Sequence, residues 1–317
     1  MKNLLVKGVC GLGNRMLALT VAGELCIKHR IDMKVCWRDK MYSDDGSNAF
    51  ERFFGIKGKY RANKLNGSIF PTNWRGNIDV PFDELANFRG KSRTNPDYKM
   101  VGISNTHDTS VIAPMCPDYR SPKAILQLRK KLRRFMFIKA DAMALIAMFT
   151  KEKFIGAEHI IGVHVRWAAP TKRKVSLDDL VNKIDRQIER HPSSKVMICA
   201  DNKEPINILG NIYADRLILM PKWLPSGEVT NGTEKQALHQ PTSRQDKTNQ
   251  SKVYEEAVKE MGCLAACDTI IYQHNSSFGA CAAVLSNAGS SNIIPWGEET
   301  NDTNENYGWH NSKKTKK

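Results

Sequence analysis

Several features that would place this sequence in a special class are absent from it. Its 317 residues contain no apolar run of 18 or more, so no helix is predicted to span a membrane. Aromatic residues make up only 8%, and the 33 acidic residues are outnumbered by 48 basic ones. There is no Cys-x-x-Cys pair and no Walker A motif. These absences argue against a membrane helix, a zinc-ribbon type of metal site and a P-loop nucleotide site.

The start of the sequence and its cysteines indicate a cytoplasmic protein. The N-terminal apolar stretch is short and contains Lys7, which does not fit a signal peptide. Without an export signal, the eight cysteines are expected to be reduced, buried and structural. Only Cys10 lies beside a predicted site, and no group of cysteines has the spacing of metal ligands. We therefore expect neither a bound metal nor a catalytic thiol.

Hydrophobic periodicity divides the sequence into two α/β units. An apolar run, a glycine-rich turn, a helical spacing and a second strand predict a β-α-β unit over residues 4–37. Between residues 160 and 296, continuous apolar runs that are typical of buried parallel strands alternate with helical patterns. The predicted strands cover 160–165, 195–200, 216–220, 269–273 and 293–296, and a single long helix is predicted from Pro122 to about Lys151. We predict an N-terminal α/β domain over 1–150, a C-terminal α/β domain over 151–300 and a polar basic tail over 301–317.

Polar residues gather where predicted strands end. Gly11–Arg15, His164–Arg166 and His274–Gly279 each follow a strand, and Asp201 follows a fourth. Ligands of parallel α/β sheets bind beyond the carboxyl ends of the strands. We therefore expect these four segments to form one binding site.

The glycine-rich turn allows backbone amides to approach an anion at a helix N-terminus. A complete dinucleotide fingerprint requires a third glycine, where Met16 stands here. The turn alone is therefore also compatible with a purely structural link between strand and helix.

The other strand ends carry residues suited to a nucleotide. Side chains alternate along a strand, so His164 and Arg166 lie on one face. Arginine binds phosphate in bidentate fashion, and histidine can recognise a base or ribose. Ser276 and Ser277, at the start of a predicted helix, suit a diphosphate. A satisfied structural pair and an ordinary helix cap are the alternatives.

Together these segments resemble the fucosyltransferase superfamily, in particular the nodulation-type α1,6-fucosyltransferases, with the α1,2- and protein O-fucosyltransferases as related groups. The similarity lies in GLGNR, a strand ending in His-x-Arg, ICAD and SSFG, and it covers residues 4–37, 160–201 and 253–287. The resemblance implies a GT-B fold, in which two Rossmann-type α/β domains face a cleft and the C-terminal one mainly holds the nucleotide sugar. It also implies GDP-fucose as donor, inversion at the anomeric carbon, and neither a metal nor another cofactor.

The resemblance also implies roles for individual residues. Arg166 matches the catalytic arginine that neutralises the β-phosphate as GDP leaves. Glu260 takes the place of an acid that reads guanine, and a plain surface acid is the alternative for this position. The implied donor-binding residues are Gly11, Gly13, Asn14, Arg15, His164, Asp201, Glu260, Ser276, Ser277 and Phe278. The sequence departs from the family's H-x-R-R-x-D pattern, because Trp167 and Ala169 replace its second arginine and its acid.

We predict an inverting, metal-independent glycosyltransferase that moves a sugar, most simply fucose, from a GDP-sugar to a glycan, a lipid-linked oligosaccharide or a protein. One alternative is an NAD(P)-dependent oxidoreductase built on the β-α-β opening. Another is a polyanion or nucleic-acid binder, based on the net charge of +15 and the basic cluster between Lys123 and Lys139. Few aromatic residues accompany that cluster, which argues against nucleic acid. Loose candidates for a general base are Asp44, Asp45 and Glu51, although solvated loop acids are the simpler interpretation.

Overall fold

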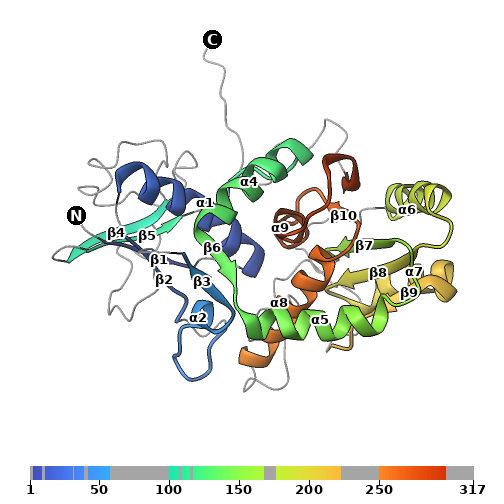
Figure 1. Ribbon diagram of the computed structural model, residues 1–317, viewed down its shortest axis with the longest axis horizontal. Coiled ribbons are helices and arrows are strands. Elements are labelled where there is room, and N and C mark those ends of the chain that lie inside the picture. Colours follow the sequence, from blue (N-terminus) through green and yellow to red (C-terminus); the bar gives the residue numbers. More distant parts are fainter. Residues whose placement is uncertain are drawn as a thin grey trace, which may run out of the picture.

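In the computed structural model, a layer of helices lies between two sheets (Figure 1). The predicted tail over 301–317 and Cys10 lie outside the residues that the structure describes. The described residues are 3–8, 11–30, 32–38, 42–57, 100–106, 109–114, 117–167, 176–222 and 250–297.

The N-terminal sheet has the strand order β2-β1-β5-β4. Strands β2 and β5 run parallel to β1, whereas β4 runs antiparallel to β5. The parallel pairing of β1 with β2 across α1 confirms the predicted β-α-β unit. In the polar segment that follows, the sequence predicts only a weak strand over 100–103 and misses β5. The elements are β1 (Asn3–Lys7), α1 (Leu12–His29), β2 (Asp32–Cys36), β4 (Met100–Thr106) and β5 (Thr109–Pro114).

The C-terminal sheet is fully parallel, with the order β11-β10-β7-β8-β9. Strand β7 lies at its centre and is buried along its whole length, as its continuous apolar sequence predicts. The predicted bounds of β7, β8, β10 and β11 are confirmed residue for residue. The strands are β7 (Ile160–Val165), β8 (Lys195–Ala200), β9 (Leu217–Leu219), β10 (Thr269–Gln273) and β11 (Ile293–Trp296).

Two layers of helices cover this sheet. Helices α8 and α9 pack on one face, and α6 and α7 pack on the other. Their bounds are α6 (Asp178–Arg190), α7 (Lys203–Tyr213), α8 (Gln250–Ala265) and α9 (Ser277–Leu285), with two 3-10 turns at η1 (Ala214–Arg216) and η4 (Ser290–Asn292).

The single long helix predicted from Pro122 to about Lys151 is wrong, because two helices form there. Ser121 accepts a hydrogen bond from the Ala124 N–H at the start of α4, and the chain becomes extended at Met136. The short apolar strand that follows pairs antiparallel with another one, which removes it from the helix. The elements are α2 (Ala49–Phe53), β3 (Phe54–Ile56), α4 (Pro122–Phe135), β6 (Met136–Ile138) and α5 (Ala140–Lys153).

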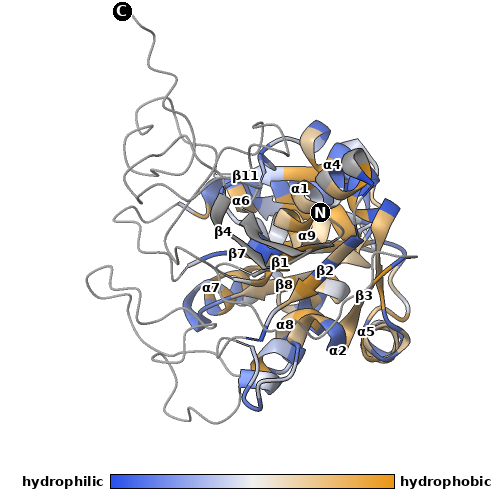
Figure 2. Ribbon diagram, turned by 90° about the vertical axis from the view of Figure 1, so that its left-hand side faces the viewer, coloured by the Kyte–Doolittle hydropathy of each residue, from blue (hydrophilic) through white to orange (hydrophobic). Residues whose placement is uncertain are grey.

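The two halves share one hydrophobic core. Helix α1 contacts α9 and α4, and α5 contacts α8, so helices of both halves pack between the sheets (Figure 1). Figure 2 shows hydrophobic residues concentrated where these helices meet. Because the halves meet at α1 and α9, the N-termini of these two helices are brought together.

Candidate functional site

The strand-end residues of β7 face α8 and α9. Gly162 of β7 lies against Leu264 of α8, which defines the face of the strand toward α8. Val163 and Val165 point to the other face and belong to the core on the α6 and α7 side. His164 follows the same alternation, and it stacks on Phe278 of α9 with ring centroids 5.3 Å apart. The predicted common face for His164 and Arg166 therefore lies toward α9.

Arg166 lies at the carboxyl edge of the sheet, between β8 and β10. Its backbone N–H donates to Gln273 Oε1 at 2.8 Å, and its guanidinium lies 3.9 Å from Asp201 Oδ2. The Arg166 side chain is 31% exposed, whereas that of Asp201 is 11% exposed. The structure thus places a partly exposed cation beside Asp201 at the carboxyl edge of the sheet, and its backbone is tied to Gln273 at the end of β10.

Trp167 is tied to the loop between β8 and α7 and to the first turn of α7 by two hydrogen bonds. Its backbone N–H donates to Asp201 Oδ1 at 2.6 Å, and its indole Nε1–H donates to Glu204 Oε2 at 2.8 Å. Glu204 and Gln273 are contacts that the sequence analysis missed. Glu204 comes shortly after β8, and Gln273 is the last residue of β10. The available sequence signal for Gln273 was a polar residue that ends an apolar strand.

His164 is neutral at physiological pH. Burial, together with the charges of Arg166 and Lys222, lowers the pKa of His164 to about 3. Its Nδ1 has no hydrogen-bond partner among the described residues. Gly279 permits this close packing, since a Cβ at that position would lie 3.0 Å from His164 Nδ1. Nδ1 is enclosed against α9, so the neutral imidazole would contact a nucleoside through its ring face or its other nitrogen.

The N-termini of α1 and α9 adjoin each other. A Cβ at Gly13, in the first turn of α1, would lie only 2.5 Å from the backbone nitrogen of Phe278. Gly11 and Ser276 occupy the two N-cap positions, and neither makes a side-chain capping hydrogen bond. Neither first turn contains an acidic residue. Two positive helix ends therefore meet at one point, which favours an anion there.

The remaining residues of the glycine-rich turn separate in the structure. Asn14 is half-buried in the first turn of α1. The Arg15 guanidinium is buried and lies over the rings of Trp37 and Tyr42, at 5.7 and 4.8 Å from their centroids. Arg15 is thus held within the aromatic edge of the N-terminal sheet, while Gly13 contacts α9.

Glu260 is buried, so the alternative of a surface acid is wrong. It accepts a hydrogen bond from Lys222 Nζ, and both side chains are less than one-tenth exposed. Among the described residues the pair makes no further hydrogen bond, although an ammonium has three donors. The positive charge of Lys222 also contributes to lowering the pKa of His164. No sequence motif marks Lys222.

Part of the basic cluster between Lys123 and Lys139 is structural. Arg129 is buried, and its guanidinium donates to the carbonyls of Ala283 and Ala288 at 2.8 Å each. Arg133 donates to the Ser286 carbonyl at 2.7 Å. These two arginines from α4 therefore satisfy the C-terminal end of α9 and complement its dipole.

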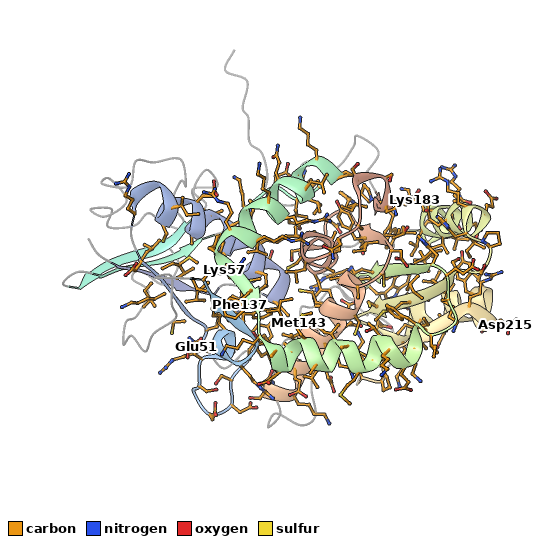
Figure 3. All side chains as sticks on the ribbon, viewed as in Figure 1. Glu51, Lys57, Phe137, Met143, Lys183 and Asp215 are labelled. Carbon is orange, nitrogen blue, oxygen red and sulfur yellow. The ribbon has the colours of Figure 1, made fainter. Side chains whose placement is uncertain are left out.

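The loose candidates for a general base have other partners. Asp44 accepts hydrogen bonds from the N–H groups of Gln250 and Ser251, which caps α8. Hydrogen bonds from Ser47 lower the pKa of Asp45 to about 2, which disfavours proton abstraction near neutral pH. Glu51 accepts from Asn48, and Figure 3 shows it in the half opposite to Lys183 and Asp215.

Burial raises the pKa values of five described thiols, those of Cys26, Cys199, Cys263, Cys267 and Cys281. All six described cysteines are buried, in line with structural roles. In the described parts of the chain, no group of three His, Cys, Asp or Glu residues could hold a metal.

No protein-family model and no curated protein match the sequence, whereas solved structures match it over most of its length. Fucosyltransferase NodZ from Bradyrhizobium aligns with a TM-score of 0.55 and 19% identity over 90% of this chain and 93% of its own. NodZ α1,6-fucosyltransferase soaked with GDP-fucose aligns with a TM-score of 0.52 and 19% identity over the same shares, 90% and 93%. A mutant of Arabidopsis thaliana FUT1 in complex with GDP aligns with a TM-score of 0.53 and 12% identity over 90% of this chain and 69% of its own. The chain has the fold of the fucosyltransferases.

This GT-B fold confirms the predicted fold class and the family resemblance at the level of architecture. The strand-end cluster lies in the sheet that the resemblance assigns to the nucleotide sugar. No helix within the described residues is long and apolar enough to cross a membrane.

Proposed function

We propose that this protein is a glycosyltransferase that moves a sugar from a GDP-sugar to a hydroxyl group. The observation that carries the proposal is the meeting of two helix N-termini, α1 and α9, that lack side-chain caps, at the sheet edge where Arg166 ends β7. Gln273 links these parts, because its side chain accepts from the Arg166 N–H and its carbonyl accepts from the Ser276 N–H at 2.9 Å. Backbone amides of α9 and the cation of Arg166 thus lie at the carboxyl edge of one sheet, in a fold that fucosyltransferases share.

This arrangement fits the charge that develops during glycosyl transfer. The bond from the anomeric carbon to the diphosphate breaks as the acceptor oxygen attacks, and negative charge collects on the departing GDP. Arg166 and the amides of α9 are preorganised donors for that charge. Ser276 and Ser277 add hydroxyls at the same turn. We propose that these groups do the work of a metal ion, so that activity persists in EDTA. Attack opposite the leaving diphosphate in one step inverts the anomeric carbon.

The nucleoside is proposed to lie near His164 and Phe278, which stack on each other. Glu260 would accept hydrogen bonds from N1–H and N2–H of guanine, as a carboxylate with an unused oxygen can. Its partner Lys222 supplies the opposite charge that a buried carboxylate requires. Asp201 is proposed to orient Arg166, and Gly11, Asn14 and Arg15 to complete the N-terminal wall.

Fucose is the first candidate for the sugar, because a NodZ α1,6-fucosyltransferase structure was obtained with GDP-fucose. The acceptor is proposed to be a hydroxyl of a glycan, a lipid-linked oligosaccharide or a protein. In this proposal residues 1–150 form the acceptor side and residues 151–300 hold the nucleotide sugar.

The contacts of the basic cluster weigh against the polyanion alternative. Arg129 and Arg133 bind the end of α9, and Arg134 lies 3.2 Å from Glu24. These charges are therefore engaged within the protein rather than displayed as a continuous binding surface.

Calorimetric titration tests the proposal most directly. GDP should bind at micromolar to low millimolar concentrations, and ADP and UDP should bind at least ~10-fold more weakly. A hydrolysis screen across GDP-fucose, GDP-mannose and UDP-sugars then identifies the donor. If GDP fails to bind at millimolar concentration, the proposed function is wrong.

The role of Glu260 in reading guanine is tested with inosine diphosphate, which lacks the N2 amino group. Glu260→Gln replaces an accepting oxygen by a donor facing the base. GDP should bind more weakly by about 1–3 kcal/mol, and the preference for GDP over inosine diphosphate should shrink. An unchanged dissociation constant for GDP would remove Glu260 from the donor site.

A further inference from the structure

Side chains hold the chain where the β7 ladder ends. The last backbone register between β7 and β8 joins Val165 to Ala200. Beyond it, the Arg166 N–H donates to Gln273 Oε1 and the Trp167 N–H donates to Asp201 Oδ1, at 2.8 and 2.6 Å. The two amides that flank the Arg166 side chain are thus held from the β10 side and from the β8 side.

The Trp167 side chain adds a third anchor. Its indole N–H donates to Glu204 Oε2 at 2.8 Å, and its ring packs against the core on the α6 and α7 side. Glu204 is itself fixed in the first turn of α7, because its N–H donates to Asn202 Oδ1 at 2.8 Å. Asp201 in the loop therefore binds the backbone of Trp167, and Glu204 in the first turn of α7 binds its side chain.

Adjacent residues of an extended chain point to opposite sides. Trp167 is fixed on the α7 side, so rotation of the chain about its own axis is prevented and the direction of Arg166 on the α9 side is set. We propose that Trp167 and Glu204 are positioning residues that hold Arg166 in line with the departing diphosphate. This inference rests on the proposed function of Arg166.

The sequence of this strand end makes such positioning valuable. Where the related pattern has a second arginine, this chain has Trp167. Within the described residues Arg166 is the cation at this strand end, so its placement matters more. Misplacement of a reacting or stabilising group by about 1 Å can cost on the order of 100-fold in rate.

The test compares Glu204→Ala with Asp185→Ala, a matched variant that also removes a hydrogen bond on the α6 and α7 side of the sheet. Asp185 of α6 accepts from the Tyr213 hydroxyl of α7 at 2.8 Å, another aromatic-to-carboxylate hydrogen bond. Glu204→Ala should lower turnover of the GDP-sugar ~10–50-fold while GDP affinity changes less than ~3-fold. Glu204→Gln keeps an accepting oxygen and should restore most of the turnover. Asp185→Ala should lower the thermal midpoint similarly but leave turnover near the wild-type value.

Equal turnover in Glu204→Ala and wild type, or equal losses in Glu204→Ala and Asp185→Ala, would overturn the positioning role. If Glu204→Ala does not fold, Trp167→Phe removes the indole donor while keeping an aromatic ring and carries the same expectation, with normal turnover overturning it. Failure of the proposed function is distinguishable, because the wild-type protein itself would then neither bind GDP nor transfer a sugar.

Discussion

The carboxyl ends of the two sheets hold their arginines in opposite surroundings. At the C-terminal sheet, the Arg166 side chain is 31% exposed and faces a carboxylate 3.9 Å away. At the N-terminal sheet, Arg15 is 3% exposed and lies over the rings of Trp37 and Tyr42. A partly exposed guanidinium is available to an incoming anion, whereas one enclosed by aromatic rings contributes to packing. The two edges are thus expected to respond differently to equivalent substitutions.

Arg166→Lys should give the largest effect. The substitution keeps the charge and loses the planar fork, so turnover should fall at least ~100-fold. GDP affinity should fall less, because the contribution is larger in the transition state. The ion pair with Asp201 is partly exposed and contributes little to stability, so the thermal midpoint should barely move. Near-normal turnover, or a large drop in the thermal midpoint, would assign Arg166 a structural role instead.

Gly13→Ala tests the contact that joins the two edges. The added Cβ would overlap the backbone of α9, so the two helix N-termini must separate. We expect a loss of about 2 kcal/mol in the free energy of unfolding and roughly 10-fold weaker GDP binding.

Gly210→Ala is the matched control for this change. Gly210 lies within helix α7, and its Cβ would lie 3.5 Å from Leu217 Cδ2 of β9, an ordinary van der Waals contact. Stability should rise by up to ~1 kcal/mol and GDP binding should stay the same. Full GDP affinity in Gly13→Ala would show that the meeting of the helix ends does not form the anion site.

The buried His164 predicts a pH signature for the C-terminal edge. Its pKa of about 3 in the folded state lies below the value of about 6.5 in an unfolded chain. Between these values the unfolded state binds more protons, so stability falls as the pH drops from about 6.5 toward 3. Lowering the pH from 7 to 5 should cost roughly 2 kcal/mol through this group.

Denaturant unfolding at both pH values measures the effect, with His164→Gln as the comparison. The variant should show a flatter dependence. Burial also lowers the pKa of His159, which is present in both proteins, so the difference between them reports His164. Identical pH dependence in the two proteins would contradict the burial of a neutral imidazole.

Arg15→Lys should give the smallest effect and the opposite balance from Arg166→Lys. Replacing a stacked guanidinium by an ammonium should lower the free energy of unfolding by about 1 kcal/mol. Turnover should change only a few-fold. A loss above ~100-fold with an unchanged thermal midpoint would make the two edges functionally equivalent and break the comparison.

The helices and strands were predicted from the sequence more accurately in the C-terminal half than in the N-terminal half. In the C-terminal half, continuous apolar strands and regular alternation predicted β7, β8, β10 and β11 to the residue, because burial on both faces leaves a strong signal. In the N-terminal half, β5 was missed and one helix was predicted where α4, β6 and α5 form. The helical spacing there continued across Met136, and only pairing with a distant strand breaks it.

The site shows the same limit. Arg166 and His164 could be placed on one face from their spacing alone. Lys222, Glu204 and Gln273 could not be found in this way, because their roles come from partners 38, 37 and 107 positions away in the sequence. Glu260 was placed by resemblance, and only the structure shows that it is buried.

Helix α8 connects two parts of the molecule that are far apart. Asp44 of the N-terminal half caps its first residues, and Glu260 lies near its other end. An α-helix of 16 residues is a stiff rod about 24 Å long. One rigid element therefore contacts the N-terminal half at its start and carries the carboxylate proposed to read the base further along. We expect a displacement of Asp44 relative to the C-terminal sheet to reach the base site along this helix.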